Sequence, residues 1–66
     1  MQVLINGESH TLSDGIVLSA LLDQLEISGR RIAVEINESI VPRSQHVNTV
    51  IQQDDKIEII HAIGGG

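Results

Sequence analysis

Three consecutive glycines, Gly64, Gly65 and Gly66, stand at the C-terminal end of this sequence, and their position suggests chemistry. They do not form a phosphate-binding loop, because such a loop needs a following helix whose N–H groups face the anion. The reactive group that remains is the α-carboxylate of Gly66, which is ionised at neutral pH and is therefore a poor electrophile. Adenylation would give this carboxylate a good leaving group, after which a sulfur or nitrogen nucleophile could attack the carbonyl carbon.

The glycines directly follow an apolar segment, which predicts a domain over residues 1–62 and a flexible tail over residues 63–66. In extended form the tail would reach about 13 Å, which is enough to enter a partner's pocket. Glycine has no Cβ, so its backbone can also approach a ligand closely. Composition alone leaves open the alternative that the glycines have no function.

The other residue types offer little chemistry. The three histidines, His10, His46 and His61, lack the local cluster of ligands that a zinc site needs, and there is no cysteine. We predict that His10 is half-buried in a strand and that His61 lines the base of the tail. The adjacent Asp54 and Asp55 could bind a cation, but we expect both carboxylates to be solvated in a polar turn. No serine has the partners needed for nucleophilic catalysis. We therefore expect no catalytic residue, no metal and no bound cofactor.

The composition predicts one small domain with an aliphatic core. Eleven Ile, six Val and six Leu are present, whereas Phe, Tyr, Trp and Cys are absent. Packing and backbone pairing must therefore provide the stability that disulfides or a metal give to other small domains. The net charge of −5 argues against nucleic acid as a partner. With no signal peptide and no apolar run of about 20 residues, we expect a cytoplasmic protein without membrane contact.

A hairpin is the first of the elements that would position the tail. Residues 1–5 alternate, so that every second apolar side chain shares one face. Asn6-Gly7 is typical of a type I′ turn, in which both central residues need a positive φ. Residues 8–12 then return as a second strand and end in a turn at residues 13–15.

An amphipathic helix is predicted to begin at Val17. We expect about three turns of helix. Ser13 or Asp14 would cap its start from the preceding turn, and Ser28-Gly29 would end it. Its leucines recur at intervals of three and four residues and so form one apolar stripe, namely Leu18, Leu21, Leu22 and Leu25.

The remaining elements are predicted to be strands. Residues 32–36 alternate and predict a third strand, and a short strand at Ile40-Val41 ends at Pro42, which cannot donate a ladder hydrogen bond. The last strand is expected from Lys56 to about Ala62. It would place Ile57 and Ile59 on the core face.

Between the short strand and the last one, residues 43–55 are mixed and polar. In this irregular segment we expect Val47, Val50 and Ile51 to turn inward. The complete order predicts an α+β domain in which a mixed sheet of four to five strands packs on one main helix. That is the order of a β-grasp (ubiquitin-like) fold.

Four segments of the sequence carry a resemblance to a known family. They are residues 1–7, the leucines of the helix, residues 40–45 (Ile-Val-Pro-Arg-Ser-Gln) and residues 55–66. Together they resemble the ThiS family of sulfur carriers in thiamine biosynthesis over essentially the whole chain. The terminal diglycine is shared with all ubiquitin-like carriers, whereas the Val-Pro-Arg-Ser-Gln stretch is more specific. Val17 departs from the family pattern, in which a threonine-like helix cap is common.

The resemblance implies a carrier and not an enzyme. An E1-like adenylyltransferase would use ATP to adenylate Gly66, and a sulfur-donating enzyme would supply the sulfur that turns the adenylate into a thiocarboxylate. Thiazole synthase would then accept this sulfur into the thiazole ring. By position, Gly66 is the modified residue, Gly65 is the other half of the diglycine, and Gly64 is a spacer. All three would enter the partner's site.

Strand alternation predicts a docking surface. Leu4 and Ile60 should lie on the sheet face opposite the helix, and if the first and last strands are neighbours they would form an exposed apolar pair near the tail. Such contiguous apolar surface often marks a docking site. Ile63 and Arg43 are further candidates for partner contact. The alternative is that these are isolated surface side chains without function.

Three other functions stay open on the sequence. The first is a carrier of the molybdopterin-synthase type, although those chains are usually longer and have aromatic or proline residues before the diglycine, where this sequence has His61-Ala62-Ile63. The second is a protein modifier that becomes conjugated to lysines. The third is a pure interaction module, for which Gly65 and Gly66 would be dispensable.

Overall fold

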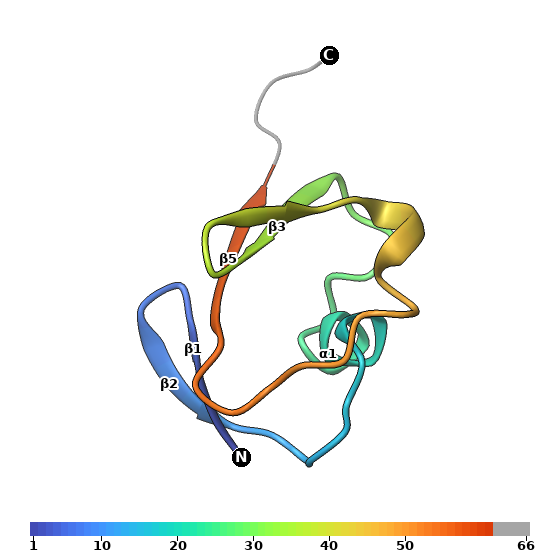
Figure 1. The fold of residues 1–66 in the computed structure, drawn as a ribbon. Coiled ribbons are helices and arrows are strands. Elements are labelled where there is room, and N and C mark those ends of the chain that lie inside the picture. The colour runs from blue at the N-terminus through green and yellow to red at the C-terminus, as the bar shows by residue number, and fades with distance from the viewer. Residues whose placement is uncertain (62–66) are drawn as a thin grey trace.

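Residues 1–61 are described by the computed structural model, in which five strands form one mixed sheet (Figure 1). The sheet has the order β2-β1-β5-β3-β4. One α-helix, α1 (Leu18–Gln24), and one 3-10 helix, η1 (Arg43–Gln45), complete the elements of this part of the chain. The strands are β1 (Gln2–Ile5), β2 (Glu8–Thr11), β3 (Ile32–Ile36), β4 (Ser39–Val41) and β5 (Lys56–His61).

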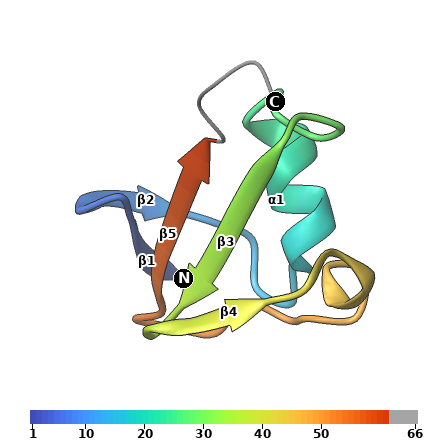
Figure 2. The ribbon, with the colours of Figure 1, turned by 90° about the horizontal axis from the view of Figure 1, so that it is seen from above.

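The last strand, β5, lies in the centre of the sheet (Figure 2). On one side it runs parallel to β1, with Ile5 opposite Ile57. On the other side it runs antiparallel to β3, with Val34 opposite Ile59. The first and last strands are therefore neighbours, which is the condition on which the predicted apolar pair of Leu4 and Ile60 depends.

The core is aliphatic, as the composition predicts, and lies between α1 and the sheet. The leucines of α1 pack against residues of the central strands, so the predicted leucine stripe and the predicted core face of β5 are both confirmed. Because the sheet and the helix each bury one apolar face, each needs the other to exclude water. The fully buried side chains with the largest volumes are Leu18, Leu21, Ile51, Ile57, Val3 and Val34.

The start of α1 is capped by distant backbone and not by the preceding turn. Val17 is the N-cap residue and offers no side-chain hydrogen bond. Instead, the N–H of Leu18 donates to the Thr49 carbonyl at 2.8 Å, and the N–H of Ser19 donates to the His46 carbonyl at 3.0 Å. These carbonyls satisfy N–H groups that have no partner within the helix. The prediction that Ser13 or Asp14 caps the helix is wrong.

The end of α1 comes earlier than predicted. The seven residues of the helix make about two turns, and Glu26 then adopts a left-handed φ of 60°. Its N–H donates to the Asp23 carbonyl at 3.0 Å, and the N–H of Ile27 donates to the Leu22 carbonyl at 3.1 Å. These two bonds define a Schellman motif. Gly29 also has a positive φ of 82° but lies in the following loop, so it does not end the helix.

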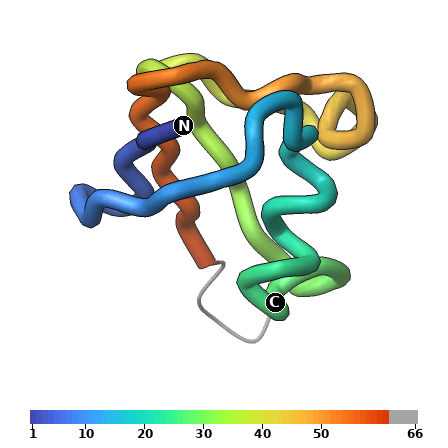
Figure 3. The backbone as a smooth tube through the Cα atoms, turned by 90° about the horizontal axis from the view of Figure 1, so that it is seen from below, coloured from blue at the N-terminus to red at the C-terminus, as the bar shows by residue number. Residues whose placement is uncertain are grey.

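The segment after η1 runs past the start of α1 and returns to β5 (Figure 3). Of its three predicted inward-pointing side chains, Ile51 is buried, whereas Val47 and Val50 are exposed to 64% and 46%. Val50 pairs with Val17 through an isolated β-bridge. Its main chain therefore contacts the residue that precedes α1, while its side chain is exposed to water. His46 is buried instead, and its Nε2–H donates to the Val41 carbonyl at 3.1 Å.

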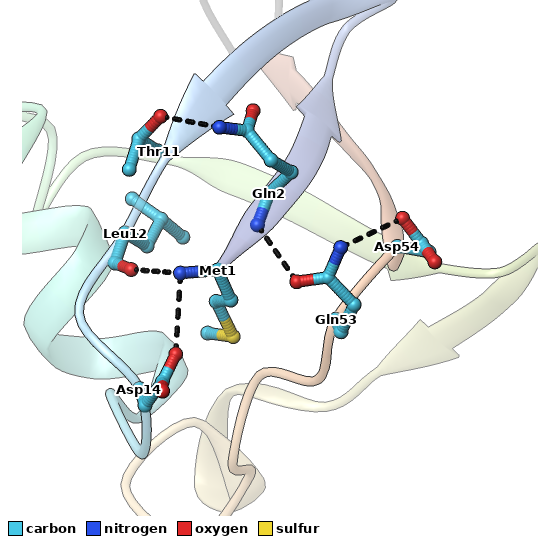
Figure 4. A network of polar contacts seen from close by, with 7 residues as sticks. All are labelled: Met1, Gln2, Thr11, Leu12, Asp14, Gln53 and Asp54. Carbon is cyan, nitrogen blue, oxygen red and sulfur yellow. Dashed lines mark hydrogen bonds and ion pairs between the residues drawn. The ribbon is translucent and has the colours of Figure 1, made fainter.

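A polar network holds the start of β1 between two other segments (Figure 4). The Met1 ammonium donates to the Leu12 carbonyl at 2.8 Å and forms an ion pair with Asp14 at 3.2 Å. The N–H of Gln2 donates to Oε1 of Gln53 at 2.9 Å. Asp14 thus pairs with the amino terminus rather than with the helix. The network ties β1 to β2 and to the loop that leads into β5.

Candidate functional site

The predicted reactive residues, Gly64, Gly65 and Gly66, lie outside the described residues, as does Ile63. The described chain ends with His61, the last residue of β5, which is paired with Ile32 of β3. The described contacts that bear on the site are therefore those of β5 with its neighbours, because this strand directly precedes residues 62–66.

An asparagine contacts β5 near its C-terminal end. Asn6, with a φ of 50°, and Gly7, with a φ of 81°, form the turn between β1 and β2, which confirms the predicted need for positive φ at both positions. The side chain of Asn6 reaches across to β5. Its Oδ1 accepts a hydrogen bond from the N–H of Ile59 at 2.8 Å, and its Nδ2 donates to the Ile59 carbonyl at 3.4 Å.

A second asparagine contacts β5 at its beginning. Asn37 lies in the turn between β3 and β4 and has a φ of 52°. Its main-chain N–H donates to the Lys56 carbonyl at 2.8 Å, and its Oδ1 accepts from the Lys56 N–H at 2.9 Å. Neither asparagine contact is predicted from the sequence. The Asn-Gly pair predicts only the turn at Asn6. No local pattern predicts the contact with Ile59, which lies 53 residues further along the sequence.

The two adjacent aspartates before β5 differ in their surroundings. Asp54 is exposed, as predicted. Asp55 is buried, and its carboxylate accepts hydrogen bonds from Nδ2 of Asn37 at 2.9 Å and from the N–H of Gln52 at 2.8 Å. The prediction of a solvated carboxylate is wrong for Asp55. This side chain shapes the turn into β5.

A cavity of about 310 Å³ lies beside the C-terminal end of β5. Both Asn6 and His61 line it, so His61 borders a cavity at the point where the described chain ends. His10 lines it as well, is 32% exposed, and has Nε2 3.3 Å from Oε1 of Glu8. This confirms the half-buried position of His10. The cavity is also lined by Ile5, Leu25, Ile27 and Ile59.

The predicted docking residues do not form one patch. Leu4 and Ile60 are exposed to 39% and 50%, but Leu4 lies beside Lys56 at the start of β5, four residues before Ile60. Glu58 separates them on the same strand face, at a strand spacing of about 3.3 Å per residue. Ile60 lies instead beside Ala33 of β3. The predicted apolar pair is therefore two separate exposed side chains.

Arg43 lies apart from both of these side chains. It begins η1, and its Nη2 donates to the Arg30 carbonyl at 2.9 Å. It also lines a cavity of about 220 Å³ with residues of α1, among them Ser19 and Leu22. Arg43 therefore belongs to the helix side of the domain, whereas Leu4 and Ile60 belong to the opposite sheet face.

Two features that would support other kinds of site are absent from residues 1–61. No group of three or more histidine, aspartate and glutamate side chains in this range is placed to hold a metal ion. No helix in the same range has the length and apolar character that crossing a membrane requires.

The fold and the end of β5 define a class of protein. A mixed five-stranded sheet with one packed helix, whose central last strand leads to terminal glycines, is a ubiquitin-like β-grasp domain. The crystal structure of the thiamine biosynthesis protein ThiS from Geobacter metallireducens has this fold and matches with a TM-score of 0.87 and 25% identity, covering 100% of both chains.

The sequence comparisons place the chain more narrowly. Residues 3–66 match the model of the ThiS family. The sulfur carrier protein ThiS of Escherichia coli is 35% identical over 66 residues, which is 100% of both proteins. The chain therefore belongs to the ThiS family, the sulfur carrier family of thiamine biosynthesis.

Some relatives are much longer. The thiazole synthase of Paramagnetospirillum magneticum is 41% identical over 66 residues, and that of Magnetococcus marinus is also 41% identical. These 66 residues are 100% of the present chain but only 20% of each thiazole synthase. The chain thus spans about a fifth of the length of these two relatives.

Proposed function

We propose that this chain carries sulfur on Gly66 for the synthesis of the thiazole ring of thiamine. An oxygen of the Gly66 carboxylate attacks the α-phosphorus of ATP on an E1-like adenylyltransferase, and pyrophosphate leaves. A sulfur nucleophile at the oxidation level of sulfide, supplied by a sulfur-donating enzyme, then attacks the carbonyl carbon. The C–S bond forms, the C–O bond to the phosphate breaks, and AMP leaves. Thiazole synthase accepts the sulfur from the resulting thiocarboxylate.

The observation that carries this proposal is the match to the E. coli sulfur carrier over the full length of both chains. The three terminal glycines fit the chemistry, because a backbone without Cβ atoms can enter a narrow site closely. The long relatives support thiazole synthase as the acceptor. In them, a segment similar to this chain occurs within a protein named thiazole synthase.

Intact mass spectrometry tests the proposal. The chain is incubated with an E1-like adenylyltransferase of thiamine biosynthesis, its sulfur donor and ATP, beside a variant that lacks Gly66. We expect a mass increase equal to the replacement of one oxygen by sulfur, and we expect it only when Gly66 is present. No increase under conditions that convert a known carrier would refute the proposal. Adducts linked to lysine side chains of other proteins would instead indicate a protein modifier.

We also propose that partners dock on the sheet face opposite α1. Ile60 is the best-placed contact, because it is exposed to 50% one residue before the end of β5, with Ile63 following it toward the glycines. Leu4 would form a second, separate contact on the same face. Arg43 would add a polar contact only to a partner that also reaches the helix side.

Substitution to glutamate tests this docking surface. We expect Ile60→Glu to weaken binding to the adenylyltransferase and to thiazole synthase by roughly tenfold or more, as for a central interface contact. Leu4→Glu should have a smaller effect. Val47→Glu is the matched control, because Val47 is an exposed aliphatic residue outside the sheet. Isothermal titration calorimetry measures the three affinities, and equal affinities for all variants and the parent would contradict the proposal.

A further inference from the structure

The parallel pairing of β1 with β5 ends before β5 does. The N–H of Leu4 donates to the Asp55 carbonyl at 3.0 Å, and the N–H of Asn6 donates to the Ile57 carbonyl at 2.9 Å. In a parallel ladder the next bond would run from the N–H of Ile59 to the main chain of β1. The chain turns away at this point, because Asn6 and Gly7 both adopt a positive φ. Ile59 is thereby left without a main-chain partner on the β1 side.

The side chain of Asn6 takes the place of the missing peptide group. A primary amide has a carbonyl acceptor and N–H donors, as a peptide group does. Oδ1 of Asn6 accepts from the N–H of Ile59 at 2.8 Å, and Nδ2 donates more weakly to the Ile59 carbonyl at 3.4 Å. Both atoms of β5 that would continue the ladder are therefore satisfied by one side chain. Asn6 thus continues the hydrogen bonding of β5 from Ile57 to Ile59, two residues closer to the C-terminal end of the strand.

Asn37 does the same at the opposite end of the strand. It is also an asparagine with a positive φ in a hairpin turn, and its Oδ1 accepts from the N–H of Lys56 at 2.9 Å. Both asparagines are exposed, and both join a turn to the main chain of β5. They differ in position, since Asn37 holds the first residue of β5, whereas Asn6 holds a residue two before its end.

We propose that Asn6 is a positioning residue for the C-terminal glycines. By holding Ile59 against the sheet, it fixes the end of β5, from which the sequence continues toward Gly66. This inference rests on the proposed function. Each residue that detaches from the sheet adds about 3.3 Å of slack to the chain. A longer free segment has more conformations to lose when the carboxylate enters a partner's site, so productive binding becomes weaker.

The matched variants Asn6→Gly and Asn37→Gly test the proposal. Glycine keeps the positive φ at each turn and removes only the side-chain amide. In Asn6→Gly we expect amide hydrogen exchange at Ile59 to become faster by roughly three- to tenfold, after correction for any change in the exchange of the other core amides. This range corresponds to the loss of one hydrogen bond. In Asn37→Gly the accelerated amide should be that of Lys56, with Ile59 unchanged.

The kinetics of thiocarboxylate formation provide the second measurement. Because Asn6 acts before the chemical step, we expect Asn6→Gly to raise the KM for the carrier by roughly threefold or more while kcat stays within about twofold. Asn37→Gly also removes a donor to the buried Asp55 carboxylate and should cost at least as much folding stability, yet it should leave KM unchanged. Asn6→Asp keeps the acceptor for the Ile59 N–H but loses the donor to the Ile59 carbonyl, so its KM should lie between those of Asn6→Gly and the parent.

Three results would overturn the inference. Equal KM values for both glycine variants would show that Asn6 contributes only to folding stability. Unchanged exchange at Ile59 in Asn6→Gly would show that the amide does not hold the strand. Absence of thiocarboxylate on the parent chain would refute the proposed function and the positioning role with it, while the exchange measurement would still report whether Asn6 holds β5.

Discussion

At the residue scale, Asp54 and Asp55 show how neighbours of one type acquire different roles. Asp54 adopts a left-handed φ of 68°, is exposed and accepts a hydrogen bond from the neighbouring Gln53, whereas Asp55 is buried and accepts two hydrogen bonds from other parts of the chain. The difference arises because Asp55 faces the turn that contains Asn37, eighteen residues earlier in the sequence. The residues next to Asp54 and Asp55 do not indicate such a distant partner. The sequence therefore predicts that both carboxylates are solvated.

Removal of the Asp55 carboxylate should therefore destabilise the fold. We expect Asp55→Ala to lower the free energy of unfolding by about 1–3 kcal/mol, because the amide of Asn37 and the N–H of Gln52 lose their acceptor. Asp54→Asn, which tolerates the left-handed φ, should change it by less than about 0.5 kcal/mol. Urea denaturation followed by circular dichroism measures both values. Similar losses for the two variants would contradict the assigned roles.

At the scale of the element, the presence of α1 follows from its leucines, whereas its limits depend on other contacts. The carbonyls of His46 and Thr49 cap its start, and they come from a segment more than twenty residues away. Its end is formed by Glu26, a residue type that rarely adopts a left-handed φ. Sequence reasoning favours a nearby glycine for this role, which is why it places the end at Ser28-Gly29.

Substitutions test two left-handed positions, Glu26 at the end of α1 and Gly29 in the following loop. Glu26→Gly should raise the free energy of unfolding by up to about 1 kcal/mol, because glycine adopts this conformation without steric cost. Gly29→Ala should lower it by about 1–2 kcal/mol. Apart from Gly29 itself and its chain neighbours, no described residue has an atom within 4 Å of the added Cβ, so this loss would come from the backbone alone. Thermal unfolding measures both, and a stabilising Gly29→Ala would be inconsistent with the described φ.

At the scale of the whole molecule, the order of the elements is predictable because each apolar face needs a partner. Alternation in β1, β3 and β5 and the leucine spacing in α1 are sufficient for the β-grasp arrangement. The separation of Leu4 from Ile60 is not predictable in this way, since alternation gives the face of a side chain but not the register between strands. The exposed Val47 and Val50 likewise lie in a segment without periodicity.

The small aliphatic core makes the fold sensitive to a single cavity. Leu18 is completely buried, so Leu18→Ala should cost about 2–5 kcal/mol. A domain of this length has a total stability of roughly 3–10 kcal/mol, so the variant should lose a large fraction of it. Val47→Ala removes exposed carbon and should change the stability by less than about 0.5 kcal/mol. Urea denaturation followed by circular dichroism distinguishes the two, and a Leu18→Ala variant as stable as the parent would contradict the packing described.

The central position of β5 has a mechanical consequence. A partner that grips the chain beyond His61 and pulls away from the domain applies force along the axis of β5. The strand is bonded to β1 on one side and to β3 on the other, and these bonds lie across the direction of the pull. The load is then shared in shear by many hydrogen bonds, whereas a strand peeled from an edge would break them one by one. The domain is thus built to resist traction on the end that its proposed partners would hold.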